Sequence, residues 1–209
     1  WVRGQLGSPQ ACDELVDGCD AVVHSGLHRE GRSFRGTEGD LEEFVQKNVV
    51  GSIQLIEAAR RAKTRRFVFL STCAVHERIM DDRPLDEAHP LRAMSHYGAY
   101  KAAVEQFVHS YGFGHGYEIC ALRPSGIYGV HHDVTVSKWY DLIQGIRSGR
   151  DVACQGGGKE VHVADVAAAV ELLLHAEEIA GEVFSCCDLY VSEFEVATLA
   201  RSEERRVGK

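Results

Sequence analysis

The chain has 209 residues, of which 44% are hydrophobic and 26% are charged, and its formal net charge is −8. This balance is that of an ordinary globular protein, and the negative charge argues against nucleic acid or an anionic membrane as its main partner. No apolar run reaches the roughly 18 residues of a membrane-spanning helix, and no signal-peptide pattern opens the sequence.

The seven cysteines are scattered, odd in number and without a C-x-x-C pair. They predict reduced thiols in a cytoplasmic protein rather than a disulfide framework or a zinc site. His131, His132 and Asp133 are adjacent on a predicted loop, and adjacent residues rarely converge on one ion. We therefore expect no metal site.

Hydrophobic periodicity predicts strands that alternate with helices. Residues 20–24 (DAVVH) form a short apolar run typical of a buried parallel strand, and residues 40–62 carry apolar side chains at helical spacing. Residues 65–72 (RRFVFLST) form the next predicted strand. A charged loop at 73–94 separates it from a helix over 95–111.

The second half continues the alternation. The predicted elements are a strand at 117–124, a helix at 138–148, a short strand with a glycine turn at 152–159, a helix from 163, a strand at 181–188 and a helix from 192. Strands that alternate with helices of this length predict βαβ units, and therefore an α/β fold around a parallel sheet.

Tyr97 and Lys101 lie four residues apart on the helix predicted over 95–111, and so on one face of it. An ammonium beside a phenol lowers the pKa of the phenol from about 10 toward working pH. Such a tyrosine can take a proton from an alcohol while hydride leaves the same carbon. Thr72 ends the preceding strand, where open parallel sheets bind ligands. On the pattern alone, a surface pair and a threonine that bonds its own loop stay open.

Six segments in chain order resemble motifs of the NAD(P)-dependent epimerase/dehydratase family, within the extended short-chain dehydrogenase/reductase superfamily. They are DAVVHSG, NVVGSIQLIEAAR, RRFVFLSTCAVH, SHYGAYKAAVE, LRPSGIYG and VHVADVAAAV. The likeness runs from about residue 3 to about residue 200. It departs from the family pattern at His76, where tyrosine is usual, and at His96 and Tyr100, which replace proline and serine.

The resemblance implies roles for particular residues. The implied catalytic residues are Thr72, Tyr97 and Lys101; those along the cofactor, NAD or NADP, are Ser25, Gly26, Tyr97, Lys101, Pro124 and Ile127; those against the substrate are Thr72, Cys73 and Ser125. Gln5 and Leu6 fall where the family often has Asp-Leu near the adenine. Asn48 matches a family asparagine, with a helix residue bonded to nearby backbone as the alternative.

Two other features are expected to be structural. Asp165 falls in the first turn of its helix, where a carboxylate suits the helix dipole. The glycines of QGGGK at 155–159 suggest a phosphate cradle, but they lack the strand, helix and spacing of a nucleotide-binding loop. We interpret them as a turn.

The resemblance implies a Rossmann-like doubly wound parallel sheet with a small C-terminal substrate-binding portion. The glycine motif of the first strand and helix is absent, so we expect the first βαβ unit to be missing, with the lost strands between DAVVH and RRFVFLST. We expect such a chain to fold poorly alone and to bind cofactor weakly or not at all.

We divide the chain into a partial NAD(P)-binding domain at 1–129 and, at 130–200, a substrate-binding portion with the last Rossmann elements. Residues 201–209, RSEERRVGK, are the literal translation of a common sequencing adapter, and we expect a non-native tail there. A charged, disordered native tail is the alternative.

The sequence thus predicts an NAD(P)-dependent epimerase/dehydratase-type oxidoreductase that acts on a sugar-like substrate, with tyrosine as acid/base. Gly126, Gly158 and Lys159 replace the Asn and the Arg-Asp pair that nucleotide-sugar enzymes of the family often carry, so a carbonyl or alcohol reductase stays open. A non-catalytic dinucleotide-binding regulatory subunit is a third alternative. The expected partners are a small-molecule substrate, with a nucleotide sugar as one candidate, and a second copy in a homodimer.

Overall fold

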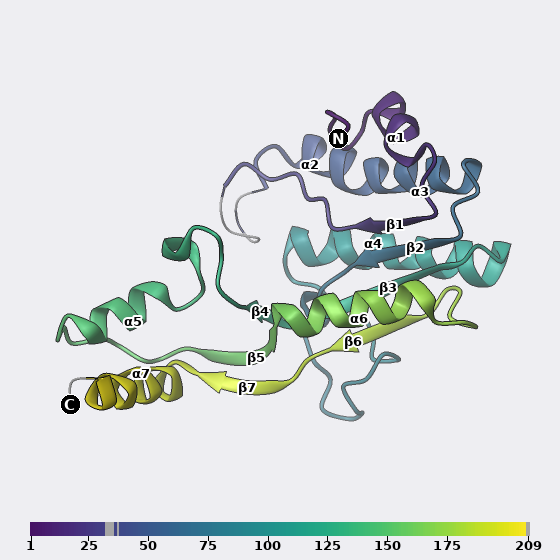
Figure 1. Cartoon of the computed structure of the whole chain (residues 1–209). Coiled ribbons are helices and arrows are strands. Elements are labelled where there is room, and N and C mark those ends of the chain that lie inside the picture. The colour runs from purple at the N-terminus through teal and green to yellow at the C-terminus, as the bar shows by residue number, and fades with distance from the viewer. Residues whose placement is uncertain (32–35, 37, 208–209) are drawn as a thin grey trace. The chain divides into compact units, whose positions relative to one another are not determined.

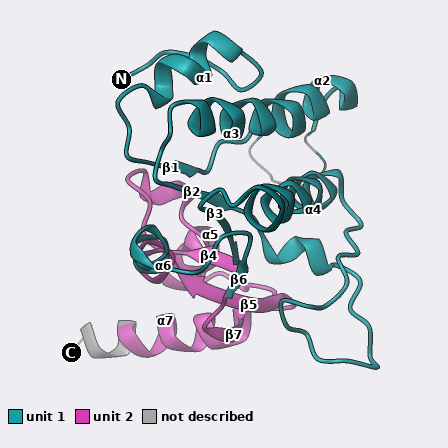
Figure 2. Ribbon diagram, turned by 90° about the vertical axis from the view of Figure 1, so that its right-hand side faces the viewer, with its two compact units in different colours: residues 1–124, 168–185 teal, residues 125–167, 186–209 magenta. Residues whose placement is uncertain are grey.

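The chain forms two compact units in a computed structural model that describes residues 1–31, 36 and 38–207. Unit 1 comprises residues 1–124 and 168–185, and unit 2 comprises residues 125–167 and those from 186 onward (Figure 2). Each unit has its own sheet, and the two are described separately below.

Unit 1 is built on a sheet whose strand order, within the described residues, is β1-β2-β3-β6 (Figure 1). Its strands are β1 (Ala21–His24), β2 (Arg66–Leu70), β3 (Ile119–Pro124) and β6 (Val183–Cys186). β1 is parallel to β2, with Ala21 opposite Arg66, and β2 is parallel to β3, with Phe67 opposite Ile119. The predicted α/β fold with a parallel sheet is confirmed.

The predicted position of the missing strands is wrong. β1 pairs directly with β2 along its whole length, so no strand can lie between residues 20–24 and 65–72. The helical segment that connects β1 to β2 is therefore a crossover between neighbouring strands. A further strand can join this sheet only at its outer edges, beside β1 or β6.

The helical elements of unit 1 are α1 (Pro9–Val16), α2 (Leu41–Val45), the π-helical turn η1 (Gln46–Val50), α3 (Gly51–Arg61), the 3₁₀ turn η2 (Cys73–His76), α4 (His96–His109) and a second π-helical turn η3 (Ser110–Gly114). The helix predicted over 40–62 thus forms without a break, but its middle turn is π-helical rather than α-helical. α1, which was not predicted, begins at the N-cap Ser8 with proline as its first residue.

Both faces of the unit 1 sheet are covered. Phe67 and Phe69 of β2 pack in the core with Ile56 of α3 and Val104 of α4. On the opposite face, the Arg66 guanidinium donates to the carbonyl of Ala176, which follows α6 (Val163–His175). A strand buried on both faces explains the continuous apolar run of RFVFL.

Unit 2 has a sheet in the order β4-β5-β7. Its elements are β4 (Gly126–Tyr128), the 3₁₀ turn η4 (Val134–Val136), α5 (Tyr140–Arg147), β5 (Gly157–His162), the start of α6, β7 (Leu189–Ser192) and α7 (Glu193–Val207). β4 and β5 are parallel, whereas β5 and β7 are antiparallel. In the part of the chain described, no helix has both the length and the apolar character needed to cross a bilayer.

One predicted element of unit 2 is placed wrongly. The short strand expected before the glycines does not form, and β5 instead starts within them at Gly157. The amides of Gln155 and Gly156 donate to the Glu193 carboxylate at 3.0 and 2.8 Å, so these residues are held by α7 before the ladder begins. A side chain at Gly157 would collide with the ring of Tyr190 on β7, so glycine fits the strand here.

Candidate active site

The parallel strands of unit 1 end at one edge of the sheet. β1 leads into Ser25 and Gly26, which are both exposed, and β2 leads into Ser71 and Thr72. β3 ends at the buried Pro124. Open parallel sheets bind ligands outside these carboxyl ends. The structure therefore gathers these predicted site residues at one edge, whereas Ser125 and Ile127 belong to unit 2.

Tyr97 and Lys101 share one face of α4, as predicted. The Lys101 Nζ lies 5.9 Å from the centroid of the Tyr97 ring and donates to the Leu70 carbonyl at 2.5 Å. Leu70 is the last residue of β2, so the lysine reaches from the helix to the carboxyl end of that strand. Lys101 is 3% exposed while Tyr97 is only partly buried, which leaves the phenol in reach of solvent.

The charge of Lys101 is finely balanced. Burial lowers the pKa of Lys101 to about 7, and the nearby Glu105 carboxylate acts in the opposite direction. The rings of Phe69 and Tyr100 lie 4.6 and 4.9 Å from Nζ, where they favour the ammonium. Small changes around Lys101 will therefore change the fraction of this amine that carries a charge.

Thr72 caps the turn η2. Its Oγ1 accepts a hydrogen bond from the amide of Ala74 at 3.2 Å, so the threonine does bond its own loop. That bond uses the oxygen as an acceptor and leaves the hydroxyl proton available to a substrate oxygen. The carbonyl of Ala74 lies so close to α4 that a Cβ at Gly98 would be 2.7 Å from it. The turn after Thr72 thus packs directly beside the residue that follows Tyr97.

His24, for which no role was predicted, holds the turn after β1. Its Nδ1 accepts from the Gly26 amide at 3.3 Å, and its Nε2 lies 2.8 Å from the Ser52 hydroxyl. Burial, with a smaller contribution from the charge of Lys101, lowers the pKa of His24 to about 3. The neutral ring therefore donates from Nε2 and fixes the backbone of residues 25–26.

Tyr100 holds the same turn from the other side. Its hydroxyl donates to the Gly26 carbonyl at 3.4 Å, and the side chain is 2% exposed. Burial raises the pKa of Tyr100, so its phenol stays protonated. This residue stands where the family has serine, and the substitution gives α4 a direct contact with the loop after β1.

Asn48 is a structural residue in this chain. Its Nδ2 donates to the carbonyls of Phe44 and His28, each at 2.9 Å, and its Oδ1 accepts from the His28 amide at 2.8 Å. Both amide hydrogens are used by backbone groups. The backbone-bonding alternative is therefore the one the structure favours.

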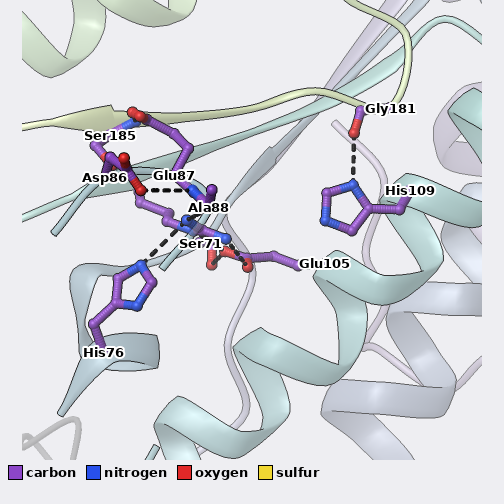
Figure 3. A network of polar contacts seen from close by, with 10 residues as sticks. Ser71, His76, Asp86, Glu87, Ala88, Glu105, His109, Gly181 and Ser185 are labelled. Carbon is purple, nitrogen blue, oxygen red and sulfur yellow. Dashed lines mark hydrogen bonds and ion pairs between the residues drawn. The ribbon is translucent and has the colours of Figure 1, made fainter. Parts of the chain in front are cut away.

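A buried polar network lies beneath the carboxyl ends of β2 and β3 (Figure 3). Arg123 Nε and Nη2 donate to the two oxygens of Glu105 at 2.9 and 2.8 Å, and both side chains are almost wholly buried. Ser71 donates to the same carboxylate. Arg123 Nη1 also lies 3.2 Å from His76 Nε2, and burial followed by the arginine charge lowers the pKa of His76. Glu105 and Arg123 were both in recognised motifs, but their pairing was not visible in the sequence.

Other candidates take no part in this edge. The amides of the QGGGK loop that bond Glu193 already hold a carboxylate of the chain itself, which fits a turn rather than a phosphate cradle. Across the residues described, no three His, Cys, Asp or Glu side chains come together as metal ligands would.

A model of the NAD dependent epimerase/dehydratase family matches residues 1–187. The chain belongs to this family. A 4-hydroxy-2-methyl-3-oxo-4-farnesyl-3,4-dihydroquinoline-1-oxide ketoreductase from Stigmatella aurantiaca is 34% identical over 194 residues, which are 90% of this chain and 54% of that protein. A dTDP-glucose 4,6-dehydratase from Streptomyces niveus is 30% identical over 190 residues, or 88% of this chain and 54% of that protein. The chain spans about half the length of these relatives.

Solved structures share the fold of this family member. The UDP-glucose 4-epimerase of Thermus thermophilus, in complex with NAD, matches with a TM-score of 0.78 at 22% identity, and the match covers 96% of this chain and 68% of that one. RMD from Pseudomonas aeruginosa, complexed with NADPH, matches with a TM-score of 0.77 at 21% identity, over 94% and 68%. The family resemblance and the Rossmann-like fold expected from the six segments are confirmed.

Proposed function

We propose that this chain is part of an NAD(P)-dependent oxidoreductase of the epimerase/dehydratase type, which moves a hydride between nicotinamide and a hydroxyl-bearing carbon of a sugar-like substrate. The observation that carries the proposal is the pair on α4, where the Lys101 amine lies beneath the partly exposed Tyr97 phenol and reaches the end of β2. The similarity to a dTDP-glucose 4,6-dehydratase supports the substrate class.

Each residue of the proposed set has a distinct role. Tyr97 exchanges a proton with the substrate oxygen, and Thr72 donates its hydroxyl hydrogen to the same oxygen. Lys101 lowers the pKa of the phenol while it carries its charge. Cys73, which is exposed next to Thr72, and Ser125 are proposed to contact the rest of the substrate.

The residues at the edge of unit 1 fit the nicotinamide-ribose half of NAD(P). Ser25 and Gly26 are accessible at the end of β1, and the Lys101 amine, whose pKa is about 7, can donate to or accept from ribose hydroxyls. We propose that these three residues hold the ribose and that Pro124 and Ile127 flank the ring. When bound, the cofactor supplies or accepts the hydride. We also propose that the protein is cytoplasmic, which its seven free cysteines support. We further propose a homodimer, which the family likeness supports.

Replacing Tyr97 by Phe in the full-length enzyme tests this function. Removal of the acid/base should lower kcat by roughly a hundred- to ten-thousandfold with little change in folding. Tyr111→Phe is the matched control, because the Tyr111 hydroxyl donates to Glu57 at 2.7 Å on the outside of α3. Turnover of Tyr97→Phe within tenfold of the wild type would rule out the proposed mechanism.

A carbonyl reductase is the second candidate. The 34% identity to a ketoreductase favours it, and so does the surrounding of Gly126. A side chain at this position would meet the Glu160 carboxylate on the paired strand β5, so the asparagine of nucleotide-sugar enzymes would fit only if that carboxylate moved. Supplying NADPH with a panel of ketones, and NAD with dTDP-glucose, separates the two: net oxidation of NADPH by a ketone selects the reductase.

A further inference from the structure

Glu77 makes an unusual set of contacts outside the proposed catalytic residues. Its Oε2 accepts from the amide of Ser95 at 2.7 Å and also from the amide of Met94. The Ser95 hydroxyl lies 3.0 and 3.1 Å from the two carboxylate oxygens. One carboxylate thereby holds two successive backbone amides and the N-cap side chain of α4.

These contacts join the two segments that carry the proposed site. Glu77 is the C-cap of η2, whose N-cap is Thr72. Ser95 is the N-cap of α4, and Tyr97 is the second residue of that helix. The Glu77–Ser95 contact connects them directly and bypasses the intervening loop at 78–93.

The charge of Glu77 suits this position. The first turn of α4 contains no acidic residue, so the helix itself supplies no carboxylate near the positive end of its dipole. Hydrogen bonds to a carboxylate are shorter and stronger than those between neutral groups. The Ser95 oxygen meanwhile accepts from the Gly98 amide at 3.1 Å, so the carboxylate, the serine and the first turn form one connected chain of bonds.

We propose that Glu77 is a positioning residue for Tyr97. It fixes the first turn of α4 against the turn that follows Thr72, and so sets the phenol relative to the threonine hydroxyl. The close approach of the Ala74 carbonyl to Gly98 is the second contact between the same two segments. Misplacement of a reacting group by about 1 Å can lower a rate by roughly a hundredfold. This inference rests on the proposed function of Tyr97.

The test combines Glu77→Ala with Tyr97→Phe in the full-length enzyme. Glu77→Ala alone should lower kcat by about ten- to a hundredfold and change KM by less than about threefold, because the substrate still binds. In the Tyr97→Phe background, the same replacement should cost less than about twofold, since the group it positions is already absent. Glu77→Gln, which keeps the shape and one acceptor oxygen, should recover part of the rate.

Glu193→Gln is the matched control. Glu193 also accepts two backbone amides, those of Gln155 and Gly156, but in unit 2. Its replacement should leave kcat within about twofold. Rates are normalised to the folded fraction measured by circular dichroism, and if Glu77→Ala does not fold, Ser95→Ala and Glu77→Gln complete the same cycle.

The possible results separate this inference from the function on which it rests. A normal rate for Tyr97→Phe overturns the proposed function. A large loss for Tyr97→Phe, with equal losses from Glu77→Ala in both backgrounds or no loss at all, overturns the positioning role alone.

Discussion

The two units each bury a carboxylate in an ion pair, but they do so in different surroundings. In unit 1, Glu105 and Arg123 are 0% and 2% exposed and share two parallel hydrogen bonds. In unit 2, the Glu160 side chain is 7% exposed while its partner Lys138 is 36% exposed. Water can therefore replace Lys138 but cannot reach the partner of Glu105. The comparison shows that the contribution of an ion pair to stability depends on the more exposed of its two side chains.

The packing around the two pairs differs in the same way. The network of unit 1 lies next to the hydrophobic core that α3 and α4 form on β2. Of the residues of unit 2 that the structure describes, those that are buried are Ser125, Gly145, Glu160, Val161 and Val166. Unit 1 is thus held together by a hydrophobic core, whereas unit 2 is held more by its strand ladder than by a core.

The largest difference between the two ion pairs is expected when Arg123 is replaced. Arg123→Met leaves the Glu105 carboxylate buried without its partner, and should lower the free energy of unfolding by about 3–5 kcal/mol, as measured with urea on the full-length protein. Arg83→Met is the control, because Arg83 pairs with Asp82 on the surface. That control should cost less than about 0.5 kcal/mol.

The double variant sharpens this prediction. Replacing Glu105 and Arg123 together by methionine removes both buried charges, and should recover most of the stability that Arg123→Met loses. If the double variant is no more stable than Arg123→Met, an unpaired buried carboxylate is not the cause of the loss; if it is less stable than the wild type, the pair stabilises unit 1 beyond the cost of burying it.

The next largest effect is expected at acid pH. His24 has a pKa of about 3 in the folded chain, against 6.5 when exposed, so the unfolded state binds the proton more readily between these values. Stability from His24 is therefore complete above about pH 6.5 and is lost as the pH falls. By linkage the loss is about 2 kcal/mol between pH 7 and pH 5.

Comparison of wild type and His24→Asn isolates this contribution. His76, whose pKa is also lowered, contributes a slope of the same sign to both proteins. The difference in unfolding free energy between them should shrink as the pH falls from 7 to 5. A difference that stays constant would show that His24 does not titrate in this range.

The smallest effect is expected in unit 2. Lys138→Met exposes Glu160 to water on one side only, and should lower the unfolding free energy by no more than about 1 kcal/mol. In high salt the difference between Lys138→Met and the wild type should be smaller still, because salt screens the attraction between the exposed Lys138 and Glu160. A loss as large as that of Arg123→Met would remove the distinction between the two pairs.

Much of unit 1 could be predicted from the sequence because its signals are local. The strands RFVFL and ICALRP are continuous apolar runs, and the Tyr97–Lys101 spacing places both side chains on one helix face. α1 was missed although Ser8 followed by proline is a helix-start signal. The local pattern at Ser8 and Pro9 was therefore sufficient to predict α1.

The errors and omissions involve contacts between distant segments. Nothing local says that β1 pairs with β2, since strand order depends on the path of the whole chain. Glu105 and Arg123 meet from a helix and a strand, and Glu77 meets Ser95 across an irregular loop. The residue types were visible in the sequence, but their partners required the tertiary structure.

The π-helical turn at Gln46–Val50 limits how the length of this helix can change. Each residue of an α-helix turns the chain by about 100°. A π-helical turn holds one more residue than the α-helical turn it replaces, so loss of one residue from it would leave a regular helix with Phe44 and Ser52 still on the buried face. Loss of a single residue should therefore be tolerated at this turn and rejected within the regular turns of α3, where it would rotate the buried side chains by about 100°.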